Sequence, residues 1–513
     1  MKPYRIFLLL VLVAVQLSAQ TDGLSRVRAY RKANEYVFLR EFFSLLSIPN
    51  LAADTVNIKR NTTFIMDMMT RRGIGQVRLL SPRTPGAAPA VYGEVLVPGA
   101  ARTIIFYAHY DGQPVSPAQW APGLSPFQPK LANGALERKG TLIHFPESGD
   151  SISPDWRIYA RGASDDKAGV TAILDAYEAL RRTGQHPGCN IKFFFEGEEE
   201  AGSTHLSEIL DQYKPLLASD LWIICDGPVH QSGKKQVVFG VRGDAHMELT
   251  VFASRRPLHS GHYGNWAPNP ALMLSKLLAS MKNDSGRVVI PGFYEDMVPF
   301  TAREKEALRQ IPPVDEQMKA ELGIISTEIP GLSLMESINL PSLNINGMQS
   351  GHVGSNSNNI IPTTASADLD LRLVLGNDWQ RQQQRVTEYI AKQGFHVLDH
   401  DPDGAERSQY EKIIKVINGM DGYNAQRTPM DLPIAFEVIR AVQKTTTEQV
   451  VLVPSLGGSL PLFLFEKYLQ GKTIIVPIAN HDNNQHGENE NIRLDNLWKG
   501  IETMASLMMI ESR

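Results

Sequence analysis

Four short apolar runs, each about the length of one strand, alternate with segments of helical periodicity in this chain. They are TIIFYAHYD (103–111), NIKFFFEGEEE (190–200), DLWIICDG (220–227) and KTIIVPIAN (472–480). Runs that are apolar on both faces are typical of buried parallel strands. Between the first two runs, KAGVTAILDAYEALRR places one apolar face on a helix: Val170, Ile173, Leu174, Tyr177 and Leu180. This alternation predicts an α/β domain with a parallel sheet.

Acidic residues and histidines gather where these runs end, and open α/β sheets bind their ligands at that edge. The candidates are His109, Asp111, Asp165, Asp166, Glu198, Glu199, Glu200, Asp226, His481 and His486. Any one of them alone is more often a helix cap, a solvated turn or an ordinary histidine. Their recurrence at one edge of one predicted sheet favours a shared site.

A site that gathers several carboxylates needs a counter-charge, because neighbouring carboxylates raise one another's pKa. Three carboxylates and two histidines can hold two divalent cations, with one carboxylate and a hydroxide bridging them. Nitrogen and oxygen ligands without cysteine suit zinc, manganese or cobalt. Two choices stay open at the level of the residues. Glu198 competes within the glutamate run, and His481 is a rival of His486.

A different pattern begins near Arg242 and predicts a second domain inserted into the first. Its segments are strand-like 244–254, helix-like 269–281, strand-like 342–348 and 365–374, and then a helix-like and a strand-like segment. This β-α-β-β-α-β order predicts an α+β domain with an antiparallel sheet. The expected division is a catalytic domain in two parts, 20–242 and 403–513, around an inserted domain at 243–402. A loop insertion at 130–156 and a helical insertion at 283–340 account for the extra length.

The first 19 residues have the order of a secretory signal peptide. Lys2 and Arg5 precede an apolar run from Ile6 to Leu17, and the small residue Ala19 marks the expected cleavage site. The run is shorter than the roughly 20 residues of a membrane-spanning helix, and no later stretch is apolar enough to span a bilayer. The sequence therefore predicts an exported protein without a stable membrane span.

Composition excludes several classes of protein. The 513 residues include 51 basic and 55 acidic ones, a formal charge of -4, which does not indicate nucleic-acid binding. Two cysteines in a chain of this length exclude a disulfide scaffold and a cysteine-rich zinc module. Both Cys189 and Cys225 stand beside apolar runs, so free buried thiols are expected, with one disulfide between neighbouring strands as the alternative in an exported protein.

Five motifs follow one another along the chain: YAHYDGQP (107–114), RGASDDKAG (161–169), EGEEEAGS (196–203), CDGP (225–228) and QHGENE (485–490). Together they resemble the di-metal exopeptidases related to carnosinase, aminoacylase and carboxypeptidase G, metallopeptidase family twenty. WAPGLSPFQP (120–129) is similar to the stretch after the first motif in the carnosinase-like dipeptidases. The resemblance covers nearly the whole mature chain. It implies a zinc-exopeptidase-like catalytic domain with a mixed, mainly parallel sheet, and an inserted lid domain that commonly mediates dimerisation.

The resemblance implies a set of five metal ligands for two divalent ions, most simply zinc, with manganese or cobalt as alternatives. His109 and Asp226 would bind one metal. Glu200 and His486 would bind the other, and Asp165 would bridge the two. The assignment depends on the register of the glutamate run.

The resemblance also implies the residues that carry the chemistry. Glu199 would be the general base, which takes a proton from a water bridging the metals and gives it to the leaving amine. Asp111 would orient the imidazole of His109. The peptide bond between Asp165 and Asp166 would be cis, as is typical of these enzymes.

Five further residues are implied to contact the substrate. His259 in RPLHSGHYG, with His262 as the alternative, would reach the substrate carbonyl, often from the partner subunit, and stabilise the oxyanion. Arg372 in DLRLV would bind the substrate carboxylate. Gly458 and Ser459 in GGS would contact the peptide, and Asn359 in NNIIP would approach it from the lid.

Together these features predict an exported di-metal exopeptidase that hydrolyses dipeptides or short peptides and forms a homodimer through its lid. Asp226 stands where aminoacylases and carboxypeptidases of this group usually have Glu, which favours the dipeptidase branch. The alternatives are an N-acyl amino acid amidohydrolase and an inactive metal- or peptide-binding homologue. Glu199 favours an enzyme over the inactive homologue. The sequence has no G-x-S-x-G nucleophile motif for a serine hydrolase and no GxGxxG cofactor loop.

Overall fold

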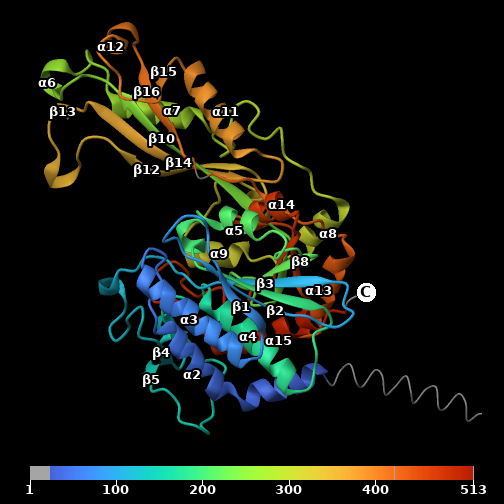
Figure 1. Cartoon of the computed structure of the whole chain (residues 1–513). Coiled ribbons are helices and arrows are strands. Elements are labelled where there is room, and N and C mark those ends of the chain that lie inside the picture. The colour runs from blue at the N-terminus through green and yellow to red at the C-terminus, as the bar shows by residue number, and fades with distance from the viewer. Residues whose placement is uncertain (1–22, 421, 512–513) are drawn as a thin grey trace, which may run out of the picture.

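Two lobes of different size make up the molecule, and strand β10 (Gly240–Phe252) runs from one into the other (Figure 1). The computed structural model describes residues 23–420 and 422–511. The expected signal peptide at 1–19 lies outside the described residues. The larger lobe contains the four apolar runs. The smaller lobe contains the part of β10 that follows Gly243 and the strands that pair with it there.

An eight-stranded mixed sheet forms the centre of the larger lobe. In sheet order its strands are β1 (Gly75–Leu80), β2 (Ala90–Val95), β7 (Asn190–Glu196), β3 (Thr103–His109), β8 (Leu221–Ile224), β20 (Thr473–Ile475), β9 (Gln236–Val238) and β18 (Val451–Val453). The four apolar runs are the adjacent strands β7, β3, β8 and β20, which run parallel. The α/β class with a mixed, mainly parallel sheet is therefore confirmed.

Helices cover both faces of this sheet. Along β3, Ile104 and Phe106 face one core, whereas Ile105 and Tyr107 face the other, as expected for a strand buried on both sides. The first core includes α2 (Glu35–Leu46), α3 (Thr55–Arg71), α4 (Lys167–Arg182), α13 (Pro433–Gln443) and α15 (Leu494–Met508). The second includes α5 (Leu206–Gln212) and α14 (Phe463–Leu469). The helix predicted at 167–182 is α4.

The smaller lobe has one large sheet with two helices packed against it, and a separate two-stranded sheet. The strands of the large sheet are β12 (Ser342–Gln349), β14 (Thr364–Leu373), β10, β16 (Ile413–Asn418) and β15 (His396–Leu398), and the helices of the lobe include α7 (Pro270–Ser280), α11 (Trp379–Lys392) and α12 (Glu406–Gln409). The expected β-α-β-β-α-β order is present, with β16 added between β10 and β15. Among these five strands, only the β15–β16 pair is parallel. Because β16 belongs to this sheet, the sheet extends past the expected boundary at 402.

Glycine occupies the point where β10 passes between the lobes. Gly240–Val241 pair with β17 (Gln426–Arg427), and Val241 pairs with β19 (Leu456–Ser459), in the larger lobe. From Gly243 onwards the strand pairs with β14. A Cβ atom on Gly243 would lie 2.4 Å from the carbonyl oxygen of Tyr423, so a larger residue does not fit.

The two expected insertions differ in structure. Residues 130–156 contribute β4 (Lys130–Ala132) and β5 (Leu142–Ile143) to a small sheet with β6 (Arg157–Tyr159) and β21 (Asn491–Arg493), so this segment is more than a loop. The segment 283–340 forms the short helices α8 (Ala302–Gln310), α9 (Asp315–Leu322) and α10 (Leu334–Ile338), as expected. Helix α8 packs against β18 of the larger lobe.

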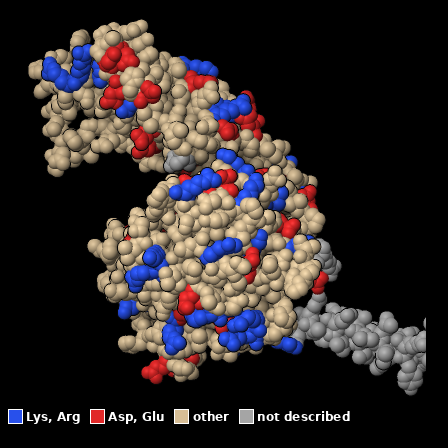
Figure 2. All heavy atoms as spheres, viewed as in Figure 1, with Lys and Arg blue, Asp and Glu red and all other residues tan. Residues whose placement is uncertain are grey.

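The surface and the thiols match the composition. Figure 2 shows a face on which basic and acidic side chains are interspersed. Cys189 and Cys225 are both buried and free. In the part of the chain that the structure describes, no helix combines the length and the apolar character that crossing a membrane requires.

Candidate metal centre

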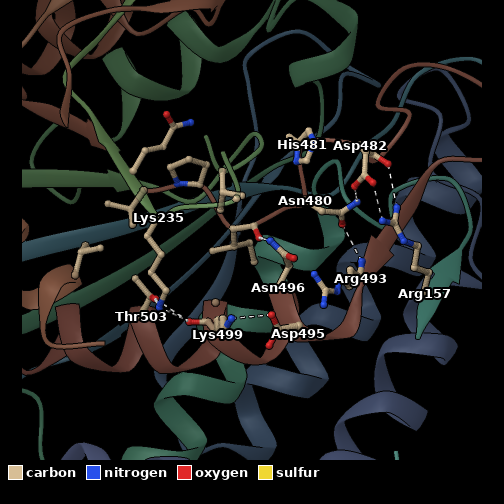
Figure 3. Close-up of a pocket in the computed structure, with 18 of the residues that line it drawn as sticks. Arg157, Lys235, Asn480, His481, Asp482, Arg493, Asp495, Asn496, Lys499 and Thr503 are labelled. Atoms are coloured by element: carbon tan, nitrogen blue, oxygen red, sulfur yellow. Dashed lines mark hydrogen bonds and ion pairs between the residues drawn. The ribbon is translucent and has the colours of Figure 1, made fainter. Parts of the chain in front are cut away.

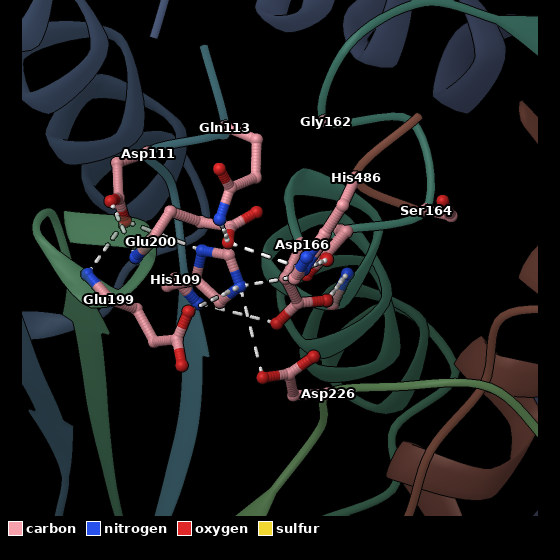
Figure 4. A network of polar contacts seen from close by, with 12 residues as sticks. His109, Asp111, Gln113, Gly162, Ser164, Asp166, Glu199, Glu200, Asp226 and His486 are labelled. Atoms are coloured by element: carbon pink, nitrogen blue, oxygen red, sulfur yellow. Dashed lines mark hydrogen bonds and ion pairs between the residues drawn. The ribbon is translucent and has the colours of Figure 1, made fainter. Parts of the chain in front are cut away.

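Five side chains from five separate segments meet at the carboxyl edge of the eight-stranded sheet (Figure 4). His109 is the last residue of β3, and Asp226 follows β8. Asp165 precedes α4, and Glu200 lies in a short 3-10 turn after β7. His486 lies in the loop between β20 and β21. Parallel strands end at one edge, which is why residues far apart in sequence converge here.

Asp165 lies between the two histidines. Its Oδ1 is 2.9 Å from Nε2 of His109, and its Oδ2 is 3.1 Å from Nε2 of His486. Oε2 of Glu200 is 3.4 Å from the same nitrogen of His486. One oxygen of the Asp165 carboxylate therefore faces each histidine, the arrangement that a bridging ligand requires.

Two more carboxylates face the same nitrogen of His109. Oδ2 of Asp226 and Oε2 of Glu199 are each 3.8 Å from Nε2 of His109. Ligand atoms of His109, Asp165 and Glu200 lie within 4.8 Å of one another, and so do those of His109, Asp166 and Asp226. The Asp166 carboxylate is already engaged, since it accepts the N–H of Gly169 and of His109.

Burial and mutual repulsion shift the pKa values of this cluster. Burial, reinforced by nearby Asp165, raises the pKa of Glu200 to about 8 and that of Asp226 to about 6. Burial also raises the pKa of Glu199 well above its usual range, with Asp226 adding to the shift. A hydrogen bond to Asp165 raises the pKa of His486 to about 9. Crowded, buried carboxylates beside two imidazoles are a donor set that fits divalent cations, which would favour the ionised acids.

Asp111 supports the cluster from behind. Its Oδ1 is 3.4 Å from Nδ1 of His109 and accepts the backbone N–H of Glu199 at 3.1 Å. Its Oδ2 accepts the N–H of Glu200 at 3.0 Å. One fully buried carboxylate thus holds the glutamate turn and lies beside the His109 imidazole.

Glu490 holds the loop before α4, a role that the sequence analysis missed. Its buried carboxylate accepts the backbone N–H groups of Gly162, Ser164 and Asp165 and pairs with Arg161 at 2.7 Å. The peptide bond between Asp165 and Asp166 is cis, as expected. Glu490 belongs to the motif QHGENE, which is the signal that could have drawn attention to it.

The two rivals in the sequence lie outside the cluster. The Glu198 carboxylate faces His205, with 2.8 Å between Oε2 and Nδ1. His481 lines a second cavity, of about 230 Å³, beside β20 and α15 (Figure 3). Basic residues such as Arg157 and Lys235 also border this second cavity.

A cavity of about 820 Å³ opens over the cluster and reaches the smaller lobe. Asp165, Glu199, Glu200, Asp226 and His486 line it, and so does Gly458. His230, for which the sequence indicated no role, lines it as well. This side chain is buried, and its Nε2 has no hydrogen-bond partner within the described structure.

Arg372 on β14 lines the same cavity from the smaller lobe. Its Nε is 3.0 Å from Oδ2 of Asp370, and its Nη1 is 3.4 Å from Oδ2 of Asp244. Asp244, Asp370 and His246 are close enough together to hold a cation, but Arg372 already supplies a positive charge between the two acids. The guanidinium expected to bind a substrate carboxylate therefore has carboxylate neighbours within the chain.

Two expected substrate contacts lie away from the cavity within one chain. His259 ends β11 (Leu258–His259), which pairs with β13 (Ile360–Ile361) beside α6 (Ser260–Tyr263). Figure 1 shows this region at the outer end of the smaller lobe. Asn359 lies next to it, and its carbonyl oxygen accepts the N–H of Ser260. Both side chains are exposed. Ser459 is in β19, next to Gly458.

A comparison with protein families identifies the family of this chain. The model of peptidase family M20/M25/M40 matches residues 105–510. The chain belongs to this family. It is accordingly a metallopeptidase, as the resemblance implied, and membership implies the use of divalent metal ions.

Relatives of this M20 peptidase include proteins named as dipeptidases. The Beta-Ala-His dipeptidase of Homo sapiens is 24% identical over 92% of this chain and 85% of its own length. The Cys-Gly metallodipeptidase dug1 of Schizosaccharomyces pombe is 24% identical over 91% of this chain and 93% of its own length. Among solved structures, the M20 family metallo-carboxypeptidase Sso-CP2 of Sulfolobus solfataricus superposes with a TM-score of 0.73. It is 25% identical, and the match covers 92% of this chain and 98% of that one.

Proposed function

We propose that this M20 peptidase is an exported di-metal dipeptidase that hydrolyses dipeptides or other short peptides. The observation that carries the proposal is the position of Asp165. Its Oδ1 faces Nε2 of His109 and its Oδ2 faces Nε2 of His486, while the Glu199 carboxylate also faces Nε2 of His109. The dipeptidase names of the relatives support the substrate class.

His109 and Asp226 would hold one divalent ion, Glu200 and His486 the other, and Asp165 both. Zinc suits these ligands best, with manganese or cobalt as alternatives. When bound, the two ions would polarise the peptide carbonyl and lower the pKa of water. The observations that support this pairing are the 2.9 and 3.1 Å approaches of Asp165 to the two imidazoles.

Glu199 is the proposed general base. Its carboxylate lies in the cavity beside His109, and its backbone N–H is held by Asp111. It takes a proton from the attacking water and gives it to the departing amine as the C–N bond breaks.

The substrate contacts are proposals on the same basis. Arg372 would bind the substrate carboxylate, and Gly458 and Ser459 the peptide backbone. His259 and Asn359 would act from the partner subunit of a homodimer formed through the smaller lobe. Their exposure at the outer end of that lobe supports a role across a subunit interface. The signal-peptide pattern of the first 19 residues supports export.

The test is a panel of dipeptides and N-acyl amino acids assayed with zinc, manganese or cobalt. Chelation should abolish peptide hydrolysis, and Glu199→Gln should lose turnover while metal analysis still finds up to two ions per chain. Glu198→Gln is the matched control, because this neighbouring side chain faces His205. Full activity in metal-free protein, or normal turnover by Glu199→Gln, would overturn the mechanism. Cleavage of N-acyl amino acids alone would overturn the dipeptidase assignment.

A further inference from the structure

One wall of the catalytic cavity is apolar and comes from two distant parts of the chain. Helix α10, the last helix of the segment 283–340, contributes Leu334, Met335 and Ile338. The chain around β19 contributes Val453, Leu456 and Leu460. The metal cluster lies in the same cavity, so a molecule bound there would meet charged groups on one side and this apolar wall on another.

The apolar wall is fixed in place. Helix α10 begins with a capping box, in which Ser333 Oγ accepts the N–H of Glu336 and Glu336 Oε2 accepts the N–H of Ser333. At the other end, the buried side chain of Asn339 donates to the carbonyl oxygen of Met335 at 2.7 Å. A short helix held at both ends presents its side chains in a defined orientation.

The two parts of the apolar wall touch each other. A Cβ atom on Gly457 would lie 3.5 Å from Cγ2 of Ile338, so the glycine backbone packs directly against the isoleucine. Met335, Leu456 and Leu460 also pack against the second core of the larger lobe. These side chains remain partly exposed towards the cavity, where an apolar group could still cover them.

We propose that this apolar wall is a side-chain subsite, which selects peptides that carry a large apolar side chain such as leucine, methionine or phenylalanine. The inference rests on the proposed peptidase function. The backbone of a peptide is polar and common to all substrates, so it gains little from an apolar surface. Only an apolar side chain removes this surface from water, and such contacts discriminate between substrates by roughly 10–200-fold.

The experiment compares leucine with asparagine, which has a similar size and shape but a polar end. Hydrolysis of Leu-Ala, Asn-Ala, Ala-Leu and Ala-Asn is measured as kcat/KM. The leucine peptide should exceed its asparagine counterpart by at least about tenfold at one of the two positions. Equal kcat/KM values for leucine and asparagine peptides at both positions would overturn the subsite.

Variants locate the preference in the apolar wall. Met335→Gln keeps the approximate size of the side chain and adds polarity, and Ile338→Thr makes the side chain smaller and polar. Each should lower the leucine-to-asparagine ratio by about tenfold. Ile325→Thr is the matched control, since Ile325 lies in the same segment but is 97% exposed and outside the cavity. It should leave the ratio unchanged. An unchanged ratio in both wall variants would overturn the assignment.

Binding separates this inference from the proposed catalysis. Calorimetry with Glu199→Gln protein measures the affinity for Leu-Ala, Asn-Ala, Ala-Leu and Ala-Asn without turnover. Tighter binding of a leucine peptide, lost in the double variant with Met335→Gln, supports the subsite even if wild-type protein hydrolyses none of these peptides. Equal affinity for leucine and asparagine peptides overturns the subsite even if hydrolysis is fast.

Discussion

The backbone N–H of Asp165 donates a hydrogen bond of 3.0 Å to Oε1 of Glu490. The Glu490 carboxylate is fully buried and also accepts N–H groups from Gly162 and Ser164. Glu490 lies four residues after His486 in the chain, so one carboxylate connects the loop of Asp165 to the segment of His486. The distance between Asp165 and His486 at the metal centre therefore depends on Glu490, which does not itself line the cavity.

Glu490→Gln should destabilise the protein and lower its activity. The amide would turn a donor towards backbone N–H groups and leave buried Arg161 without its counter-charge. We expect a loss of about 3–5 kcal/mol in the free energy of unfolding, measured by urea denaturation. Glu488→Gln, two residues away and exposed, should change it by less than about 0.5 kcal/mol. Wild-type stability of Glu490→Gln would contradict this account.

Asp111→Asn should lower kcat by about 10–100-fold with little change in KM. In asparagine an NH2 group replaces one of the two oxygens, so a donor would face the N–H group of either Glu199 or Glu200, which the aspartate accepts with one oxygen each. The glutamate turn would then lose its fixed position. Steady-state kinetics on a hydrolysed dipeptide checks this, with the exposed Asp211→Asn as the control. An unchanged kcat in Asp111→Asn would show that the turn is held by other contacts.

Lys235 should make the stability of the protein depend on pH. Its Nζ donates to Thr445 and Thr503 at 2.7 and 2.6 Å beside the second cavity (Figure 3), and burial lowers its pKa from 10.5 to about 7. Between these two values the unfolded chain binds more protons than the folded chain, so this group makes stability rise with pH, by at most about 1.4 kcal/mol per unit.

Urea denaturation at pH 7, 8 and 9 measures this dependence. Lys235→Met should remove the rise of the free energy of unfolding with pH that Lys235 contributes. The stability that the variant gains relative to wild type should be largest near pH 7. Lys214→Met removes a positive charge from the surface and serves as the control for net charge. Parallel pH profiles for wild type and Lys235→Met would contradict the prediction.

Mixing two inactive variants should restore activity if His259 acts across a dimer interface. Glu199→Gln disables the base, and His259→Ala removes the side chain at the outer end of the smaller lobe. A mixed dimer would contain one site with both groups intact, so random exchange should return roughly a quarter of wild-type activity. The measurement is dipeptide hydrolysis after the two variants are refolded or incubated together. No recovery in verified mixed dimers would place His259 outside the site.

The sequence was most informative where a single element decides the outcome. The runs that end at His109 and Asp226 are apolar on both faces, which is why their place in the parallel sheet and the convergence of their last residues could be predicted. Glu490 could not be assigned in the same way, because a carboxylate that accepts distant backbone N–H groups leaves no periodic pattern. Strand β16 was missed because IIKVIN is short and lacks alternation. The place of His230 in the cavity lining could not be predicted either, because it depends on how loops pack in three dimensions.

Strand β10 connects the smaller lobe to the larger one as a strand that is paired at both ends. It is hydrogen-bonded to β17 and β19 at one end and to β14 and β16 further along, and the returning chain bonds to it through Tyr423 and Asp244. A flexible tether would let the lobe drift freely, whereas this connection can yield only by twisting and bending a paired strand. The smaller lobe should therefore be restrained elastically. Bending of β10 should oppose its movement towards a substrate and return it to its resting position once the products have left.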